Sequence, residues 1–177
     1  MLRDASIARA LVFTRTKHGA NRLSEQLDRA GIGSAAIHGN KTQGARERAL
    51  DGFRRGTTRV LVATDVAARG IDVDGVSLVV NYDMPNVAES YVHRIGRTGR
   101  AGASGRAISF CDSTERSLLV DIERFIRRRL PIAPSGAPGG SPEMPAEAAA
   151  MAQPPPAPSH VRRPPSHRHG GFRARGA

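Results

Sequence analysis

The segment HRIGRTGR, from His93 to Arg100, holds the side chains of this chain that are best suited to chemistry. Arg94, Arg97 and Arg100 recur at intervals of three residues, with glycines between them. A guanidinium is a planar fork of N–H donors that stays charged at physiological pH, so such a cluster suits phosphate oxygens. If the segment begins as a helix, His93, Arg97 and Arg100 share one helix face. A solvated basic face is the alternative interpretation.

A second polar segment, ATDVAARGIDV, runs from Ala63 to Val73 and follows the apolar residues 60–62. The apolar residues predict a buried strand, and ligands of open α/β sheets bind at the carboxyl ends of strands. Gly70 permits a turn that a residue with a Cβ would resist. An ordinary corner with its own ion pairs is the alternative for one such segment. Two polar corners, each beside strand-like residues, favour a binding site.

Strand-like and helix-like segments alternate along the chain, which predicts βα units and a parallel sheet. Five strands are expected, at Ala10–Thr14, Ala35–His38, Arg59–Thr64, Ser77–Tyr82 and Arg106–Phe110. Four helices are expected, at Lys17–Ala30, Thr42–Gly56, Asn86–Ile95 and Ser113–Arg129. Phe13 and the Cys111 thiol are expected to be buried, and Leu118, Leu119, Ile122, Phe125 and Ile126 should line the inner face of the last helix.

Composition divides the 177 residues near Leu130. Residues 1–130 are expected to form one domain with its own core, whereas residues 131–177 form a Pro-, Ala- and Arg-rich basic tail. This tail has few large apolar residues, so we expect it to be disordered. The net charge of +11 favours an anionic polymer such as nucleic acid as partner. With no apolar run of transmembrane length and no secretory leader, a cytoplasmic protein without a membrane partner is expected.

The two polar segments resemble motifs V and VI of superfamily 2 helicases, specifically the DEAD-box RNA helicases. ALVFTRTK, from Ala10 to Lys17, is similar to motif IV, and HGNKTQGARERAL, from His38 to Leu50, is similar to motif IVa. The four motifs occur in the family's order, and the resemblance covers residues 5–130. It is strongest to the bacterial RhlE-like subgroup. The fold that it implies is the C-terminal RecA-like domain, an α/β fold with a parallel sheet flanked by helices.

The resemblance also implies roles for residues that face ATP. Arg97 and Arg100 would be arginine fingers that reach the γ-phosphate, and His93 would couple the nucleotide to the RNA site. Gly70 and Asp72 would approach the ribose and the phosphates.

Other positions match those that contact the RNA backbone in the family, namely Thr16, Gly39, Arg46, Thr64 and Arg69. Such contacts fix phosphates without reading bases. Asn40 departs from the pattern, because the family usually has Asp at this position. Arg94 is expected to be structural and to pair with a carboxylate such as Asp65.

The ATP-binding elements of a complete helicase are not found in these residues. A P-loop needs Gly-Lys before Ser or Thr, but Lys17 follows Thr16, Lys41 follows Asn40, and the sequence holds no Asp-Glu pair. The ligands for the Mg²⁺ of ATP are therefore expected on an N-terminal RecA-like partner domain, with no metal site in this chain.

Met1 lies close before the first strand, so the chain is expected to be the C-terminal half of an ATP-dependent RNA helicase, catalytically incomplete alone. A stand-alone RNA-binding module without turnover is one alternative. A two-domain translocase of another superfamily 2 branch, acting on DNA, is the other.

Overall fold

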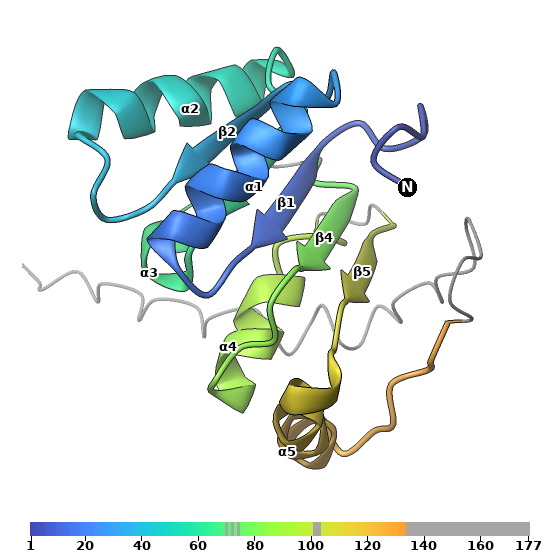
Figure 1. Ribbon diagram of the computed structural model, residues 1–177. Coiled ribbons are helices and arrows are strands. Elements are labelled where there is room, and N and C mark those ends of the chain that lie inside the picture. Colours follow the sequence, from blue (N-terminus) through green and yellow to red (C-terminus); the bar gives the residue numbers. More distant parts are fainter. Residues whose placement is uncertain (70, 72, 74, 101–103, 134–177) are drawn as a thin grey trace, which may run out of the picture.

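Five parallel strands form one sheet in the order β2-β3-β1-β4-β5 (Figure 1). The computed structural model describes residues 1–69, 71, 73, 75–100 and 104–133. The strands are β1 (Ala10–Phe13), β2 (Ser34–Ile37), β3 (Val60–Ala63), β4 (Leu78–Asn81) and β5 (Arg106–Ser109). All residues of β1, β3 and β4 are buried, because these three strands lie in the centre with both faces covered.

Helices α1 to α4 connect successive strands, and α5 follows the last strand. They are α1 (Lys17–Arg29), α2 (Gln43–Arg55), α3 (Asp65–Ala68), α4 (Ala88–Ile95) and α5 (Arg116–Ile126), the last preceded by a 3₁₀ turn at Ser113–Glu115. Thr16 and Thr42 cap α1 and α2, each accepting a hydrogen bond from a backbone N–H of the first turn. Gly56 ends α2 with a φ of 76°, a left-handed conformation that glycine adopts without strain.

Alternating side chains of the strands divide the core into two layers. In β1, Ala10 and Val12 pack with Ala20 of α1 on one face of the sheet. Leu11 and Phe13 point to the other face and join a cluster that includes Phe53 of α2. The short helix α3 contributes to this second cluster as well. The sheet is therefore covered on both faces, as expected for a parallel sheet.

A third cluster joins α4 to α5 beside the sheet. Met84, Tyr91, Ile95 and Ile122 are buried together there, and Figure 1 shows the two helices below the sheet, near the carboxyl ends of β4 and β5. This packing fixes α4, which carries the first part of the HRIGRTGR segment.

The predicted RecA-like α/β architecture is confirmed, and some details of the prediction were wrong. Helix α3 was not expected, and the last helix begins only after a separate 3₁₀ turn. Cys111 is exposed, because β5 ends at Ser109 and the thiol lies beyond the sheet edge. Phe125 is 48% exposed, because the face of α5 that packs against α4 consists of Leu118, Leu119, Ile122 and Ile126 and leaves Phe125 to one side.

Residues 134–177 of the predicted tail lie outside the described residues. Within the described part of the chain, no helix has both the length and the apolar character to cross a membrane.

Candidate functional site

The carboxyl ends of the strands bring the polar segments of the sequence to one edge of the sheet. Pairing aligns the last residues of all five strands, Ile37, Ala63, Phe13, Asn81 and Ser109. Hydrogen bonds continue one residue further, from Thr64 N to Ile37 O at 3.3 Å and from Tyr82 N to Phe13 O at 2.9 Å. The residues that follow each strand therefore lie side by side, at the edge where parallel sheets bind ligands.

Arg94 is the structural centre of this edge. Its side chain is 1% exposed, and it donates to both carboxylate oxygens of Asp65, at 2.6 and 2.8 Å. It also donates to Asn81 Oδ1 at 3.2 Å and to Asp83 O at 2.7 Å. The guanidinium carbon lies 5.1 Å from the ring centroid of Phe13, a distance that permits a cation–π interaction. The expected Arg94–Asp65 pair and the expected core position of Phe13 are confirmed.

Helix α4 ends before the remaining arginines, which corrects one prediction. The helix stops at Ile95, so Arg97 and Arg100 do not share a helix face with His93. The chain leaves the helix because Thr98, 2% exposed, packs inward and its hydroxyl donates to Val76 O. Gly99 then adopts a φ of 67°, which favours glycine.

Arg97 and Arg100 lie on a loop held against the segment that precedes β4. Nη1 of Arg97 donates to Ile71 O at 2.9 Å, and Nε of Arg100 donates to Gly96 O at 2.8 Å. Both side chains line a hollow of about 120 Å³ beside Gly75 and Ser77. The structure thus brings the two cations together on one small concave surface, and His93 is exposed on the last turn of α4. Gly70 and Asp72 lie outside the described residues.

The five positions that match RNA-contacting residues lie near the carboxyl ends of three adjacent strands. Thr16, Gly39 and Thr64 follow β1, β2 and β3 within three residues. Arg46 lies near the start of α2, where its Nε is buried without a hydrogen-bond partner, and Arg69 is exposed directly after α3. A Cβ built on Gly39 would meet no atom within 4 Å, so the backbone there is open to a close approach.

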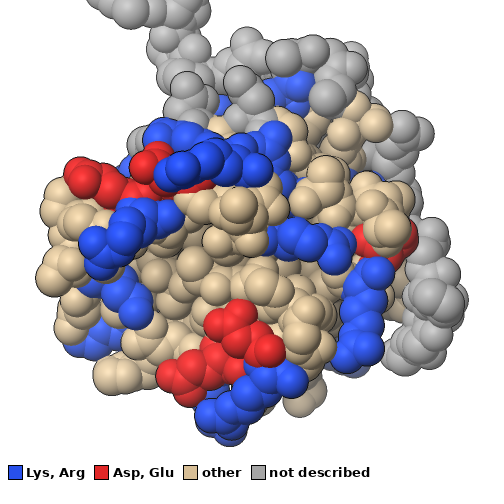
Figure 2. All heavy atoms as spheres, turned by 90° about the horizontal axis from the view of Figure 1, so that it is seen from above, with Lys and Arg blue, Asp and Glu red and all other residues tan. Residues whose placement is uncertain are grey.

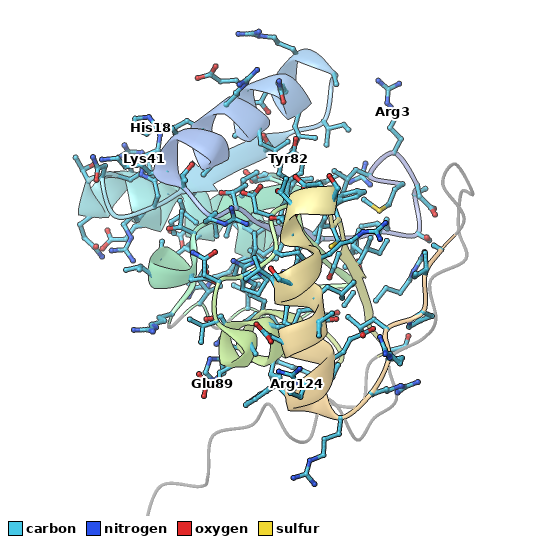
Figure 3. All side chains as sticks on the ribbon, turned by 60° about the horizontal axis from the view of Figure 1, so that its bottom comes forward. Arg3, His18, Lys41, Tyr82, Glu89 and Arg124 are labelled. Carbon is cyan, nitrogen blue, oxygen red and sulfur yellow. The ribbon has the colours of Figure 1, made fainter. Side chains whose placement is uncertain are left out.

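A group of cations surrounds His38, and the sequence interpretation did not identify it. Nδ1 of His38 accepts a hydrogen bond from Asn40 N at 3.3 Å, and Nε2 lies 3.0 Å from Asn21 Oδ1. These partners favour a neutral ring with its proton on Nε2. Burial lowers the pKa of His38, and the neighbouring charges of Lys41, Lys17 and His18 lower it further. The labels of His18 and Lys41 in Figure 3 mark this corner of the edge.

Lys17 and Lys41 are the only lysines of the sequence, and both follow strand ends, a signal that could have marked this corner. Surface charge alone would not have marked it, because basic side chains also occur on other faces. Figure 2 views the molecule from the amino ends of the strands and shows Lys and Arg mixed with Asp and Glu there. Among the described residues, no group of three or more His, Cys, Asp or Glu could hold a metal ion.

A RecA-like domain with a basic cluster at the carboxyl edge of its sheet is the class of protein that this geometry defines. The model of the helicase conserved C-terminal domain matches residues 1–102. The chain therefore belongs to this family, in the form found in DEAD-box RNA helicases.

Relatives from several organisms agree with this assignment. The chain is 53% identical over 116 residues to the ATP-dependent RNA helicase DbpA of Bacillus subtilis, which covers 66% of this chain and 24% of that protein. The chain spans about a quarter or less of the length of the curated relatives it matches.

Two solved structures show the same fold. The E. coli DEAD-box protein SrmB, bound to regulator of ribonuclease activity A, aligns with a TM-score of 0.69 and 42% identity over 72% of this chain and 75% of that one. S. cerevisiae Dbp5, bound to RNA and ADP BeF3, aligns with a TM-score of 0.64 and 40% identity over 71% of this chain and 35% of that one.

Removal of Arg94 should destabilise the domain. Arg94→Ala leaves the buried Asn81 Oδ1 without this donor and opens a cavity beside Phe13, so the free energy of unfolding should fall by about 3 kcal/mol. Arg94→Lys keeps the charge but not the fork, and should be intermediate. Urea denaturation measures both, with the exposed Arg124→Ala as control, expected within about 0.5 kcal/mol of the unchanged protein. An Arg94→Ala protein as stable as this control would contradict the central role of Arg94.

The neutral state of His38 should make stability depend on pH. The pKa of His38 is lower in the folded state than its ordinary value of 6.5. The contribution of neutral His38 to the free energy of unfolding is therefore complete above pH 6.5 and is lost as the pH falls through the folded-state pKa. His38→Gln should therefore lose less stability than the unchanged protein between neutral pH and about pH 5. Urea denaturation at both pH values tests this, and the exposed Arg124→Ala, far from His38 in the sequence and absent from the causes of its shift, should keep the original dependence.

Proposed function

We propose that this chain is the C-terminal half of an ATP-dependent DEAD-box RNA helicase. The observation that carries the proposal is the combination of two features: residues that match RNA-contacting positions at the carboxyl edge of the sheet, and a two-arginine hollow beside the segment that precedes β4. In the proposed enzyme, a preceding N-terminal RecA-like domain supplies the P-loop and the carboxylates that hold the Mg²⁺ of ATP. This chain supplies the opposite wall of the nucleotide site.

Arg97 and Arg100 are proposed to act as arginine fingers. A guanidinium aimed at the transferred phosphoryl group stabilises the charge that develops in the transition state. Support comes from the loop geometry, because Thr98 is buried between the two arginines and both line the same hollow. His93, exposed on the last turn of α4, is proposed to couple the nucleotide to the RNA site through hydrogen bonds to the partner domain. Gly70 and Asp72 remain proposed contacts to the ribose and the phosphates.

The RNA backbone is proposed to cross the ends of β2, β3 and β1. Gly39 offers an open backbone, Thr64 and Thr16 offer hydroxyl groups, and Arg46 and Arg69 offer charge. Contacts of this kind hold phosphates and sugars without reading the sequence. The structure of S. cerevisiae Dbp5 contains RNA in a protein of the same fold. Binding of RNA without sequence preference follows for this chain.

Finer assignments rest on the wording of the motifs. Motifs V and VI favour the bacterial RhlE-like subgroup over other branches of the family. In such a cell, the cytoplasm contains both ATP and RNA, so we place the protein there.

The chain by itself should hydrolyse no ATP in response to RNA, since these residues hold no P-loop. Fusion behind the N-terminal RecA-like domain of a relative such as SrmB should restore RNA-stimulated hydrolysis. Arg100→Ala in this fusion should then reduce the rate constant about a thousandfold. A coupled assay of phosphate release measures the rate, with Arg124→Ala as control. Hydrolysis by the chain alone that Arg97→Ala abolishes would overturn the proposal, and an inactive fusion that still binds RNA would favour a stand-alone binding module.

Binding of single-stranded RNA to the chain should weaken as salt is added. The slope of log affinity against log salt changes by about 0.7 for each phosphate contact on a single strand. Arg46→Ala and Arg69→Ala should each make the slope shallower by about this amount. Fluorescence anisotropy over a salt series measures it. Arg55→Ala, an exposed change at the far end of α2, is the matched control and should keep the slope.

A further inference from the structure

A groove of about 430 Å³ lies between α1 and the residues that follow β4. It is lined by Arg15, Thr16, Arg22, Gln26, Tyr82 and Asp83, among others. Thr16 belongs to the proposed RNA path, whereas none of the other residues has a role in the function proposed above. Tyr82, labelled in Figure 3, marks the groove on the edge that carries the carboxyl ends of the strands.

The order of the strands places this groove next along the proposed path of the RNA. Gly39, Thr64 and Thr16 follow β2, β3 and β1, which are consecutive neighbours in the sheet. The next strand in that order is β4, and Tyr82 is the residue that directly follows it. Neighbouring strands lie about 4.8 Å apart, so a polynucleotide that crosses β2, β3 and β1 reaches Tyr82 after a further step of this size.

Tyr82 is an exposed aromatic residue held in a defined orientation. Tyr82 is 46% exposed, and Phe110, which follows β5, is 49% exposed. The two rings meet edge to face, with centroids 6.2 Å apart and an interplanar angle of 73°. Exposed aromatic rings next to cations are the stacking platforms of proteins that bind single-stranded nucleic acids.

The walls of the groove are joined by hydrogen bonds and carry charge. Nη2 of Arg15 pairs with Oε1 of Glu115 and donates to Met84 O at 3.2 Å. Arg15 N donates to Asp83 Oδ2 at 2.8 Å, which ties that carboxylate to the backbone. Met84 N donates to the same Glu115 oxygen at 3.1 Å. The ends of β1 and β4 and the start of the last helical segment are therefore joined beneath Tyr82, while Arg22 is exposed on α1.

We propose that this groove takes one further nucleotide of single-stranded RNA, next to the nucleotide at Thr16. The base stacks on the ring of Tyr82, and Arg22 attracts the adjoining phosphate. This inference rests on the proposed RNA-binding function. It extends the proposed path of the RNA from the ends of β2, β3 and β1 to the end of β4. Because every base has a π-face, the extension adds affinity without adding sequence preference.

The experiment uses the full 177-residue chain and a labelled oligouridylate, with affinity measured by fluorescence anisotropy. Tyr82→Ala should weaken binding by between about fivefold and a hundredfold, the range found for loss of one base–aromatic stack. Tyr82→Phe keeps the ring and should retain the affinity, whereas Tyr82→Leu keeps only apolar volume and should not. Phe125→Ala, which removes a similarly exposed aromatic ring from α5, is the matched control and should change nothing.

Tyrosine fluorescence gives an independent readout. The chain has no tryptophan and two tyrosines, and Tyr91 is 4% exposed, so quenching by unlabelled oligouridylate reports on Tyr82. Quenching should be present in the unchanged protein and lost in Tyr82→Phe, although this variant still binds. Arg22→Ala should make the salt dependence shallower by about 0.7, and Tyr82→Ala should leave it unaltered.

The failures of the two proposals can be told apart. The nucleotide contact at Tyr82 would be overturned alone if Tyr82→Ala and Tyr82→Leu bound RNA as tightly as the unchanged protein while Arg46→Ala bound it more weakly. The exposed pair of Tyr82 and Phe110 would then be a candidate contact for a protein partner. A complete lack of RNA binding by the unchanged chain would overturn the proposed function and this inference together. Thermal melting of Tyr82→Ala and Tyr82→Leu excludes misfolding as the cause of a loss when their midpoints match that of the unchanged protein, and preserved binding by Tyr82→Phe shows that the ring is sufficient.

Discussion

The buried guanidinium of Arg94 is the interaction on which the edge of this domain depends. It links Asp65 after β3, Asn81 at the end of β4, the Asp83 carbonyl and the Phe13 ring at the end of β1. A charge at this depth is costly unless it is paired and hydrogen-bonded, so the partners must stay in place together. The Arg94 contacts therefore fix the position of α4 relative to the ends of the three central strands. They also fix where the loop after α4 begins.

The Arg94 network adjoins two surfaces with proposed roles. The loop after α4 packs against the segment that precedes β4, where Thr98 is buried and Arg97 and Arg100 surround a small hollow. At the carboxyl edge, the ends of β2, β3 and β1 present an open backbone, hydroxyl groups and cations. Because Arg94 ties α4 to the strand ends and α4 continues into the loop of Arg97 and Arg100, a shift of α4 against the sheet would displace both surfaces. In the proposed helicase, this connection would couple the nucleotide site to the RNA site.

Local patterns predicted the regular elements well and failed where the signal was too short or came from distant residues. The helix at α3 has only four residues, too few for an apolar period to be visible. The end of α4 at Ile95 depends on the burial of Thr98 against Val76, which is a contact between distant segments. Exposure of Cys111 and Phe125 likewise follows from where β5 ends and from how little of α5 is covered. Contacts between distant segments cannot be predicted from the residue types next to them in the sequence.

The sequence by itself determined the five strands, the four longer helices and the motifs that they carry, and it suggested a carboxylate such as Asp65 as the partner of Arg94. Alternation of apolar strands with capped helices is a local property, and so is the wording of the four motifs. Only the tertiary structure decided the order β2-β3-β1-β4-β5, and with it the placement of Tyr82 beside the proposed RNA path. Strands of four residues carry little information about their neighbours, because pairing in a parallel sheet is settled by burial of both faces against helices far away in the chain.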